Sequence, residues 1–239
     1  MKKYKNTDSD YSLFPNLDAE QKSNKVEEAL EVIRKKLEGK QTKMQINDIN
    51  DGRIKSSFLE KKILPFVKEI CEGNNLPYEE AKDRDFCDFY LYGKPVNLKV
   101  SALDGADNVC GLAGIAYAFT GIKCKKESEA IKILSDFVEN NKEGNPESDY
   151  YFLIVAKENF LGDIYPIRDV FYTSVKQLAN VTPNPSNPPF QCHWNKNRNR
   201  VRRTFEEARK FIFPKISESY AKGIAKKINI KELMDECGK

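Results

Sequence analysis

The segment over residues 85–101 constrains the fold more than any other part of the chain. Aromatic and β-prone residues fill positions 86–92, and Gly93-Lys94-Pro95 supplies a turn. Val96, Leu98 and Val100 then alternate with polar residues. Because side chains alternate between the two faces of a strand, this alternation separates an apolar face from a polar one. The pattern predicts a β-hairpin whose apolar face packs on a helix.

Helical periodicity is present on both sides of this hairpin. Apolar residues at spacings of three and four predict a helix over residues 21–37, with Ser23 as N-cap and Gly39 beyond its end. A second helix is expected over 54–72, kinked at Pro65, and a third over 127–139 with Ile131 on its apolar side. Residues 111–121 fit either a buried helix or a tight loop. The apolar side of the second helix is expected to hold Ile54, Phe58, Ile63, Phe66, Val67 and Ile70.

The second half of the chain mixes strands and helices. A continuous apolar run over 150–157 predicts a central strand, and 163–166 and 190–194 predict shorter ones. Residues 169–178 are expected to be helical or a connection. Residues 182–189 hold four prolines and are expected to be irregular. A basic helix over 204–227 is expected to be interrupted near Pro214. This order predicts one α/β domain over 1–239, with a central mixed sheet flanked by helices and a helical lead-in over 1–50.

The net charge of +4 hides an uneven distribution. Residues 157–231 contain 15 basic and 6 acidic residues, a balance of +9. The densest basic part is 193–203, where Arg alternates with Asn beside Trp194. Arg and Asn donate readily to phosphates and base edges. The stretch therefore favours a polyanionic partner, although a solvated basic surface gives the same composition.

The chain has a single His and six Cys without a CxxC pair. These counts exclude His-pair chemistry and argue against a zinc ribbon. The single His lies next to Trp194 in a basic stretch, which argues against HNH-type nucleases, because these need a catalytic His within a ββα unit. No apolar run is long enough to span a bilayer, and no GK[ST] follows the glycines at 105–114, so no phosphate-cradling loop is expected. Residues 1–10 lack an apolar core, so we expect no signal peptide and reduced thiols in the cytoplasm.

The polar face of the hairpin carries the candidate chemistry. Asp88 lies on the first strand, and Asn97 and Lys99 share one face of the second. A carboxylate and an amide oxygen suit a hard cation such as Mg²⁺. A neighbouring Lys can activate a water or stabilise a phosphoryl oxyanion. Phosphodiester hydrolysis needs these parts, whereas a structural hairpin can carry the same residues by chance.

Asp88, ten intervening residues and Lys99 resemble the motif of the PD-(D/E)xK nuclease superfamily, and within it the type II restriction endonucleases. In that family an Asp opens a hairpin strand, and an acid and a Lys two residues later lie on the next strand. Asn97 departs from this pattern, because Asp or Glu is usual there, and the site then needs another carboxylate. A helical Glu upstream often completes such sites in the family, which indicates Glu60. Asp85 is a rival for the role of Asp88.

The resemblance implies a restriction-endonuclease-like core and a type II site-specific deoxyribonuclease that hydrolyses double-stranded DNA. Asp88, Glu60 and Asn97 would hold Mg²⁺, for which Mn²⁺ can substitute, and Lys99 would orient or activate the water. The catalytic core would cover 51–157 and the DNA-binding portion 158–239. It also implies a homodimer that matches a palindromic site, no membrane or nucleotide cofactor, and a bacterial or archaeal cytoplasm.

Candidate DNA contacts lie on three polar segments. Asn184, Asn187 and Gln191 can pair with adenine, and the basic side chains of 193–203 would mostly hold phosphates. Two other readings stay open: a DNA-binding protein without catalysis that uses 193–203, and a repair or mobile-element nuclease on the same fold. The remaining candidates for DNA contact are Ser101, Asp107, Asn108, His193, Lys196, Arg198, Arg200, Arg202 and Arg203.

Overall fold

The computed structural model describes residues 19–43, 52–83, 85–140, 144–159, 161 and 163–237, with 19–24, 52–55 and 225–237 described by their backbone alone. Residues 1–18 and 44–50 of the expected helical lead-in over 1–50 therefore lie outside the described residues. The elements follow the chain in this order: α1 (Ala19–Leu37), β1 (Gln41–Lys43), α2 (Gly52–Gly73), β2 (Tyr78–Glu80), β3 (Phe89–Leu91), β4 (Lys94–Ser101), β5 (Asp107–Asn108), α3 (Leu112–Thr120), α4 (Glu127–Glu139), β6 (Tyr151–Ala156), β7 (Ile164–Pro166), β8 (Val170–Ser174), the 3₁₀ turn η2 (Val175–Gln177), β9 (Thr182–Pro183), β10 (Phe190–Cys192), the 3₁₀ turn η3 (Trp194–Asn197) and α5 (Phe205–Cys237).

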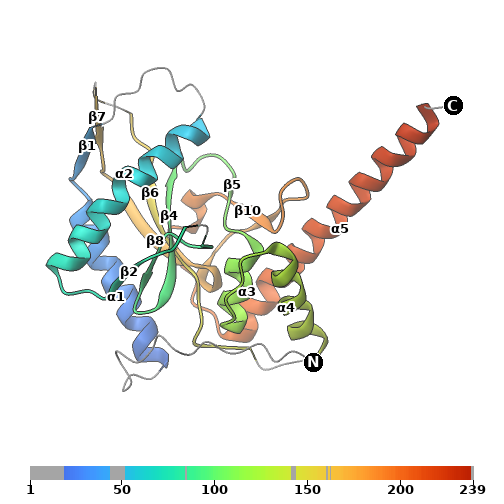
Figure 1. Ribbon diagram of the computed structural model, residues 1–239, viewed down its shortest axis with the longest axis horizontal. Coiled ribbons are helices and arrows are strands. Elements are labelled where there is room, and N and C mark those ends of the chain that lie inside the picture. Colours follow the sequence, from blue (N-terminus) through green and yellow to red (C-terminus); the bar gives the residue numbers. More distant parts are fainter. Residues whose placement is uncertain are drawn as a thin grey trace.

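A mixed five-stranded sheet forms the centre of the molecule (Figure 1). Its strand order is β2-β3-β4-β6-β8, with β4 and β6 parallel and the other pairs antiparallel. Two small sheets, β1-β7 and β5-β10-β9, lie beside it. The predicted α/β class and the hairpin are confirmed, and the central strand predicted over 150–157 spans Tyr151–Ala156. Asp88, predicted on the first strand of the hairpin, instead lies directly before β3.

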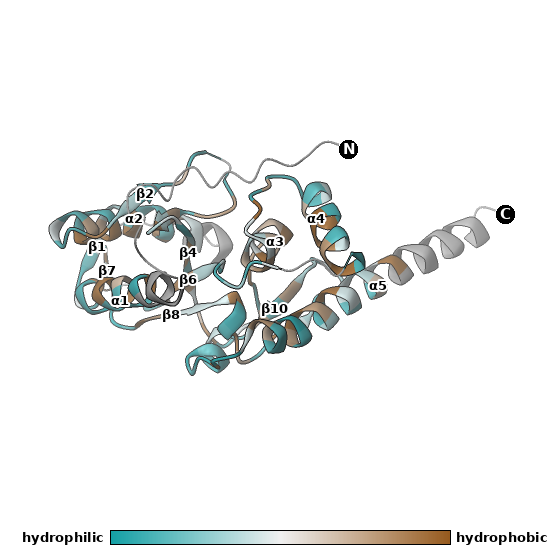
Figure 2. Ribbon diagram, turned by 90° about the horizontal axis from the view of Figure 1, so that it is seen from below, coloured by the Kyte–Doolittle hydropathy of each residue, from teal (hydrophilic) through white to brown (hydrophobic). Residues whose placement is uncertain are grey.

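Two hydrophobic cores cover the two faces of this sheet (Figure 2). On one face α1 and α2 pack against Val96, Leu98 and Val100, which are at most 5% exposed. On the other face α3, α4 and the first turns of α5 pack around Phe152 and the fully buried Trp194. The alternation of the hairpin therefore separates its faces as predicted, but helices cover both sides of the sheet.

Residues 169–178, which are expected to form a helix or a connection, instead contain strand β8 and the 3₁₀ turn η2. Val170 and Tyr172 belong to the core under α1 and α2, whereas Phe171 and Val175 belong to the opposite core. A strand buried on both faces shows a continuous apolar run, which periodicity alone does not distinguish from a helix. The register of β8 against β6 fixes this assignment.

Several details of the other elements differ from expectation. α5 continues through Pro214, because packing holds it on both sides of the proline, at Ile212 and Ser219. α2 also contains Pro65 and ends as expected near Gly73.

Two apolar residues expected in the core, Phe58 and Ile131, are exposed, and Leu59 is buried instead of Phe58. The remaining differences are that α1 begins at Ala19, so Ser23 lies inside it, that residues 111–121 hold helix α3, and that Thr182–Pro183 pairs briefly with β10.

No described helix combines the length and the apolar character needed to cross a bilayer. Five cysteines lie among the residues with described side chains, and none of these five forms a disulfide.

Candidate active site

Strand β4 extends beyond its neighbour β3, and two carboxylates close the edge that remains. β3 pairs with β4 only as far as Val96. Farther along, the backbone N–H of Leu98 donates to Oδ2 of Asp88 at 2.7 Å, and that of Val100 donates to Oε1 of Glu60 at 3.1 Å. Consecutive N–H groups on one strand edge are roughly 7 Å apart. The structure thus brings Asp88 and Glu60, from different elements, to neighbouring positions on one strand.

Lys99 lies between these two positions, with its side chain on the opposite face of β4 from Leu98 and Val100. Burial is the main effect on both acids and raises the pKa of Glu60 and of Asp88 above their ordinary values. The charge of Lys99 and the backbone N–H bonds lower both pKa values, but they offset the burial only in part. Asp88 and Asp107 further raise the pKa of Glu60. The four charged groups therefore act on one another within one site.

Asn97 is anchored on the same face as Lys99. Its Nδ2 donates to the hydroxyl of Tyr150 at 2.9 Å, and that hydroxyl donates to the carbonyl of Phe86 at 2.5 Å. The role of Asn97 as a metal ligand stays a prediction. Tyr150, which fixes this amide, was missed because its contact spans 53 residues of sequence.

Asp85 occupies a different environment from Asp88. Its carboxylate accepts hydrogen bonds from the hydroxyl of Tyr90 and the backbone N–H of Phe86, both at 2.9 Å. The acid that reaches the edge of β4 beside Lys99 is Asp88. The geometry therefore favours Asp88 over Asp85 for the role at the hairpin.

The donor set at the edge of β4 fits a hydrated hard cation. Asp88 and Glu60 each use one oxygen on a backbone N–H, which leaves the other oxygen for a ligand. Burial raises the pKa of both acids by disfavouring their charged forms, and a bound divalent cation would stabilise those charged forms. Within the described part of the chain, no three His, Cys, Asp or Glu side chains form a ready metal cage. Two carboxylates plus water suit Mg²⁺, which usually keeps several of its waters.

Two hollows flank the carboxylate pair. One, of about 420 Å³, is lined by Glu60, Lys99, Asp107 and Lys157 among others. The other, of about 680 Å³, lies between α2 and β2 and includes Asp88 in its wall. The candidate site is therefore open to a ligand on both sides of the two acids.

The polar segment after β4 is tied to this site. The hydroxyl of Ser101 donates to the carboxylate of Asp107 and accepts from the backbone N–H of Leu103 at 3.0 Å. Asp107 and Asn108 form β5, which pairs with β10 so that Asn108 faces Gln191. Ser101, Asp107, Asn108 and Gln191, proposed from sequence as DNA contacts, thus lie together beside the acids.

The proline-rich loop reaches the same region. Nδ2 of Asn184 donates to Oδ1 of Asn108 at 2.9 Å, and Oδ1 of Asn184 accepts from the backbone N–H of Asn187 at 3.2 Å. His193 Nδ1 lies 3.2 Å from the carbonyl of Asp104. The three polar segments predicted to contact DNA are therefore neighbours in space.

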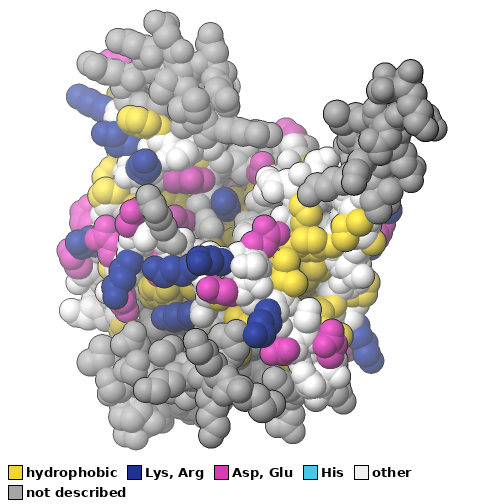
Figure 3. All heavy atoms as spheres, turned by 45° about the vertical axis from the view of Figure 1, so that its right-hand side comes forward, with side chains coloured by type: hydrophobic (Ala, Val, Ile, Leu, Met, Phe, Trp, Pro, Cys, Tyr) yellow, Lys and Arg dark blue, Asp and Glu magenta, His cyan; other side chains and the backbone are white. Residues whose placement is uncertain are grey.

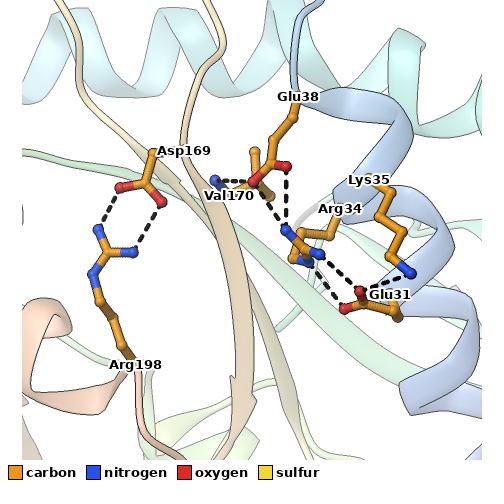
Figure 4. A network of polar contacts seen from close by, with 7 residues as sticks. All are labelled: Glu31, Arg34, Lys35, Glu38, Asp169, Val170 and Arg198. Carbon is orange, nitrogen blue, oxygen red and sulfur yellow. Dashed lines mark hydrogen bonds and ion pairs between the residues drawn. The ribbon is translucent and has the colours of Figure 1, made fainter.

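Three arginines of the basic stretch are held by other parts of the protein. Arg198 forms a bidentate ion pair with Asp169, which lowers the pKa of that acid (Figure 4). The guanidinium of Arg198 also lies 4.6 Å from the ring centroid of Phe171. Arg200 pairs with Glu27 of α1 at 2.7 Å. Arg203 donates to the carbonyl of Leu178 at 2.7 Å.

Lys196 and Arg202, by contrast, are exposed. Figure 3 shows one face of the molecule, on which Lys and Arg side chains alternate with Asp and Glu. The phosphate-binding role of the five basic residues stays a prediction, and its most accessible members are Lys196 and Arg202.

Lys157 was also missed by sequence reasoning. It follows the last residue of β6 directly, at the carboxyl end of a strand parallel to β4, where α/β sheets commonly bind ligands. The apolar run over 150–156 marks this position, but only the pairing of β6 with β4 brings Lys157 to the cavity that Lys99 also lines.

No model of a known protein family matches the chain, and no curated protein matches it.

Proposed function

We propose that the protein is a Mg²⁺-dependent, site-specific endonuclease of double-stranded DNA, with a restriction-endonuclease-like core. One observation carries the proposal: Glu60 from α2 and Asp88 from before β3 meet at the open edge of β4 on either side of Lys99. Two acids can hold a metal ion, and a lysine can stabilise the negative charge that develops at the phosphate during metal-assisted phosphodiester hydrolysis.

Asp88 and Glu60 would hold the cation, with Asn97 near them on the same strand as Lys99. When bound, Mg²⁺ or Mn²⁺ would supply positive charge at the phosphate and lower the pKa of a coordinated water. Lys99 offers up to three N–H donors to the attacking water or to a non-bridging phosphate oxygen. The backbone N–H bonds to Asp88 and Glu60 keep both carboxylates in place before substrate arrives.

The first experiment incubates the purified protein with plasmid and phage DNA of known sequence, in Mg²⁺ or Mn²⁺. We expect discrete fragments that chelation abolishes. Lys99→Ala should slow cleavage by about 100-fold or more, because it removes a donor to the developing charge. Lys126→Ala, which removes an exposed lysine before α4, should cleave as wild type does.

Three outcomes would change the proposal. Intact DNA across many sequences in both metals would overturn it. Salt-dependent binding without cleavage, unaffected by chelation and by Asp88→Ala, would indicate a non-catalytic DNA-binding protein. Cleavage of branched or damaged DNA without discrete fragments from intact duplex would indicate a repair-type nuclease on this fold.

A further inference from the structure

Lys157 extends the carboxyl end of the parallel pair β4-β6. Its backbone N–H donates to the carbonyl of Ser101 at 2.6 Å, which continues the ladder one step beyond the last residue of β6. Lys99 faces Ile154 in the same register, so Lys157 lies three residues farther along the neighbouring strand. The Cα atoms of Lys99 and Lys157 are therefore offset by roughly 10 Å along the strands and roughly 4.8 Å across them.

Both lysines line the cavity of about 420 Å³. Both are half-buried, and neither ammonium has a hydrogen bond or an ion pair with a described residue. Of the two acids in the same wall, Glu60 accepts the backbone N–H of Val100, and Asp107 accepts the hydroxyl of Ser101. Lys99 is already influenced by the charges of Glu60 and Asp88, so the ammonium of Lys157 is the group that this cavity offers to a further anionic group.

We propose that Lys157 binds the phosphate adjacent to the reacting one on the same nucleic-acid strand, while Lys99 acts at the reacting phosphate. This inference rests on the proposed function. The two lysines line one cavity from neighbouring parallel strands, and successive phosphates of one nucleic-acid strand form the kind of repeating polyanion that such a pair of ammonium groups can bind. The cavity beside Lys157, with Ser57 and Asn108 in its wall, then receives the nucleotide next to the cut.

The test measures binding and cleavage separately. Binding of a labelled duplex is followed by fluorescence anisotropy in chelator at several salt concentrations. Lys157→Ala should weaken binding by about 5- to 10-fold for every sequence, because one phosphate contact is lost. The salt slope, which is the slope of the logarithm of the binding constant against the logarithm of the salt concentration, should fall in magnitude by about 1. In cleavage this variant should raise KM with little change in kcat, because the contact is the same in the ground and transition states.

Replacing single phosphates by uncharged methylphosphonates shows which phosphate Lys157 contacts. Methylphosphonates placed singly along the strand should weaken wild-type binding at the position next to the cut, and that position should carry no further penalty in Lys157→Ala. Lys157→Arg should retain most of the affinity, and Lys126→Ala should match wild type. A thermal melt of each variant checks that it is folded.

The outcomes separate the two proposals. If wild type cleaves DNA and Lys157→Ala matches it in affinity, salt slope and KM, the inference is overturned and the nuclease stands. If the methylphosphonate penalties in Lys157→Ala are additive at every position, the adjacent-phosphate contact is overturned. If wild type binds but never cleaves, the proposed function fails, and with it the assignment of a phosphate beside a reacting one. The salt slope then decides only whether Lys157 contacts a phosphate.

Discussion

Glu60 and Asp88 are acids that the fold holds at a cost in stability. Each is buried enough that its pKa is raised above the ordinary value, even though each accepts a backbone N–H and lies near Lys99. An acid whose pKa is higher in the folded state stabilises the protein only while it is protonated. That stability is fully present below the ordinary pKa and is lost as the pH rises through the raised pKa.

We therefore expect Glu60→Gln to increase the free energy of unfolding at neutral pH, because the amide keeps an oxygen for Val100 without a buried charge. The gain should disappear toward pH 4, where Glu60 is protonated. Urea unfolding at several pH values measures it. Glu72→Gln, an exposed change on the same helix, serves as control, and a loss of stability in Glu60→Gln at pH 7 would contradict this account.

Thermal melts of wild type and Glu60→Gln, with and without Mg²⁺, test whether a cation binds at these acids. A ligand present at ten times its Kd stabilises the folded state by about 1.4 kcal/mol. Mg²⁺ should therefore raise the melting temperature of wild type at neutral pH, and it should do so less in Glu60→Gln. Equal shifts in the two proteins would place the cation elsewhere.

At the scale of elements, local patterns were sufficient where an element is specified by its own residues. The hairpin, α1, α4 and β6 follow from periodicity and turn residues that lie next to one another in sequence. β8 could not be distinguished from a helix, because both of its faces are buried by partners far away in the chain. Glu60 could be predicted as a site residue only from the family resemblance, because its hydrogen bond with Val100 joins residues that are 40 positions apart in the sequence.

The segment between α4 and β6 depends on a close approach at Gly144. A Cβ there would lie 2.1 Å from Cζ of Phe205 and 2.7 Å from the carbonyl oxygen of Phe119. Gly144→Ala should therefore destabilise the protein by about 1–3 kcal/mol, because the start of α5 or the end of α3 must shift. Denaturant unfolding measures this, with Gly73→Ala as control, since a Cβ at Gly73 meets no atom within 4 Å. An unchanged Gly144→Ala protein would show that the segment adapts freely.

At the scale of the whole molecule, the basic stretch packs across β8 onto α1. Arg198 and Arg200 join it to Asp169 and to Glu27, and Arg200 also lies 4.3 Å from the ring of Tyr172. The charge balance of +9 over 157–231 therefore overstates the positive charge available to DNA. Composition records the arginines but not their partners, and Glu27 is 173 residues from Arg200.

Two arginine variants separate packing from DNA contact. Arg200→Ala should lower the free energy of unfolding by about 1–2 kcal/mol, through loss of a half-buried ion pair and a ring contact, with little effect on DNA affinity. Arg202→Ala, at an exposed position, should leave stability unchanged and should reduce affinity and salt slope. The reverse pattern would show that Arg200 leaves Glu27 to reach DNA.

The edge of β4 that no described strand covers has a consequence for the solubility of the protein. An unpaired strand edge offers its N–H groups to any extended chain, and natural sheets protect such edges from association. Here the carboxylates of Asp88 and Glu60 occupy two of those N–H groups and place negative charge along the edge. The two acids proposed to hold the cation therefore also block the addition of a further strand at this edge. A variant that lacks both carboxylates should leave these N–H groups unpaired and should aggregate more readily than the native chain.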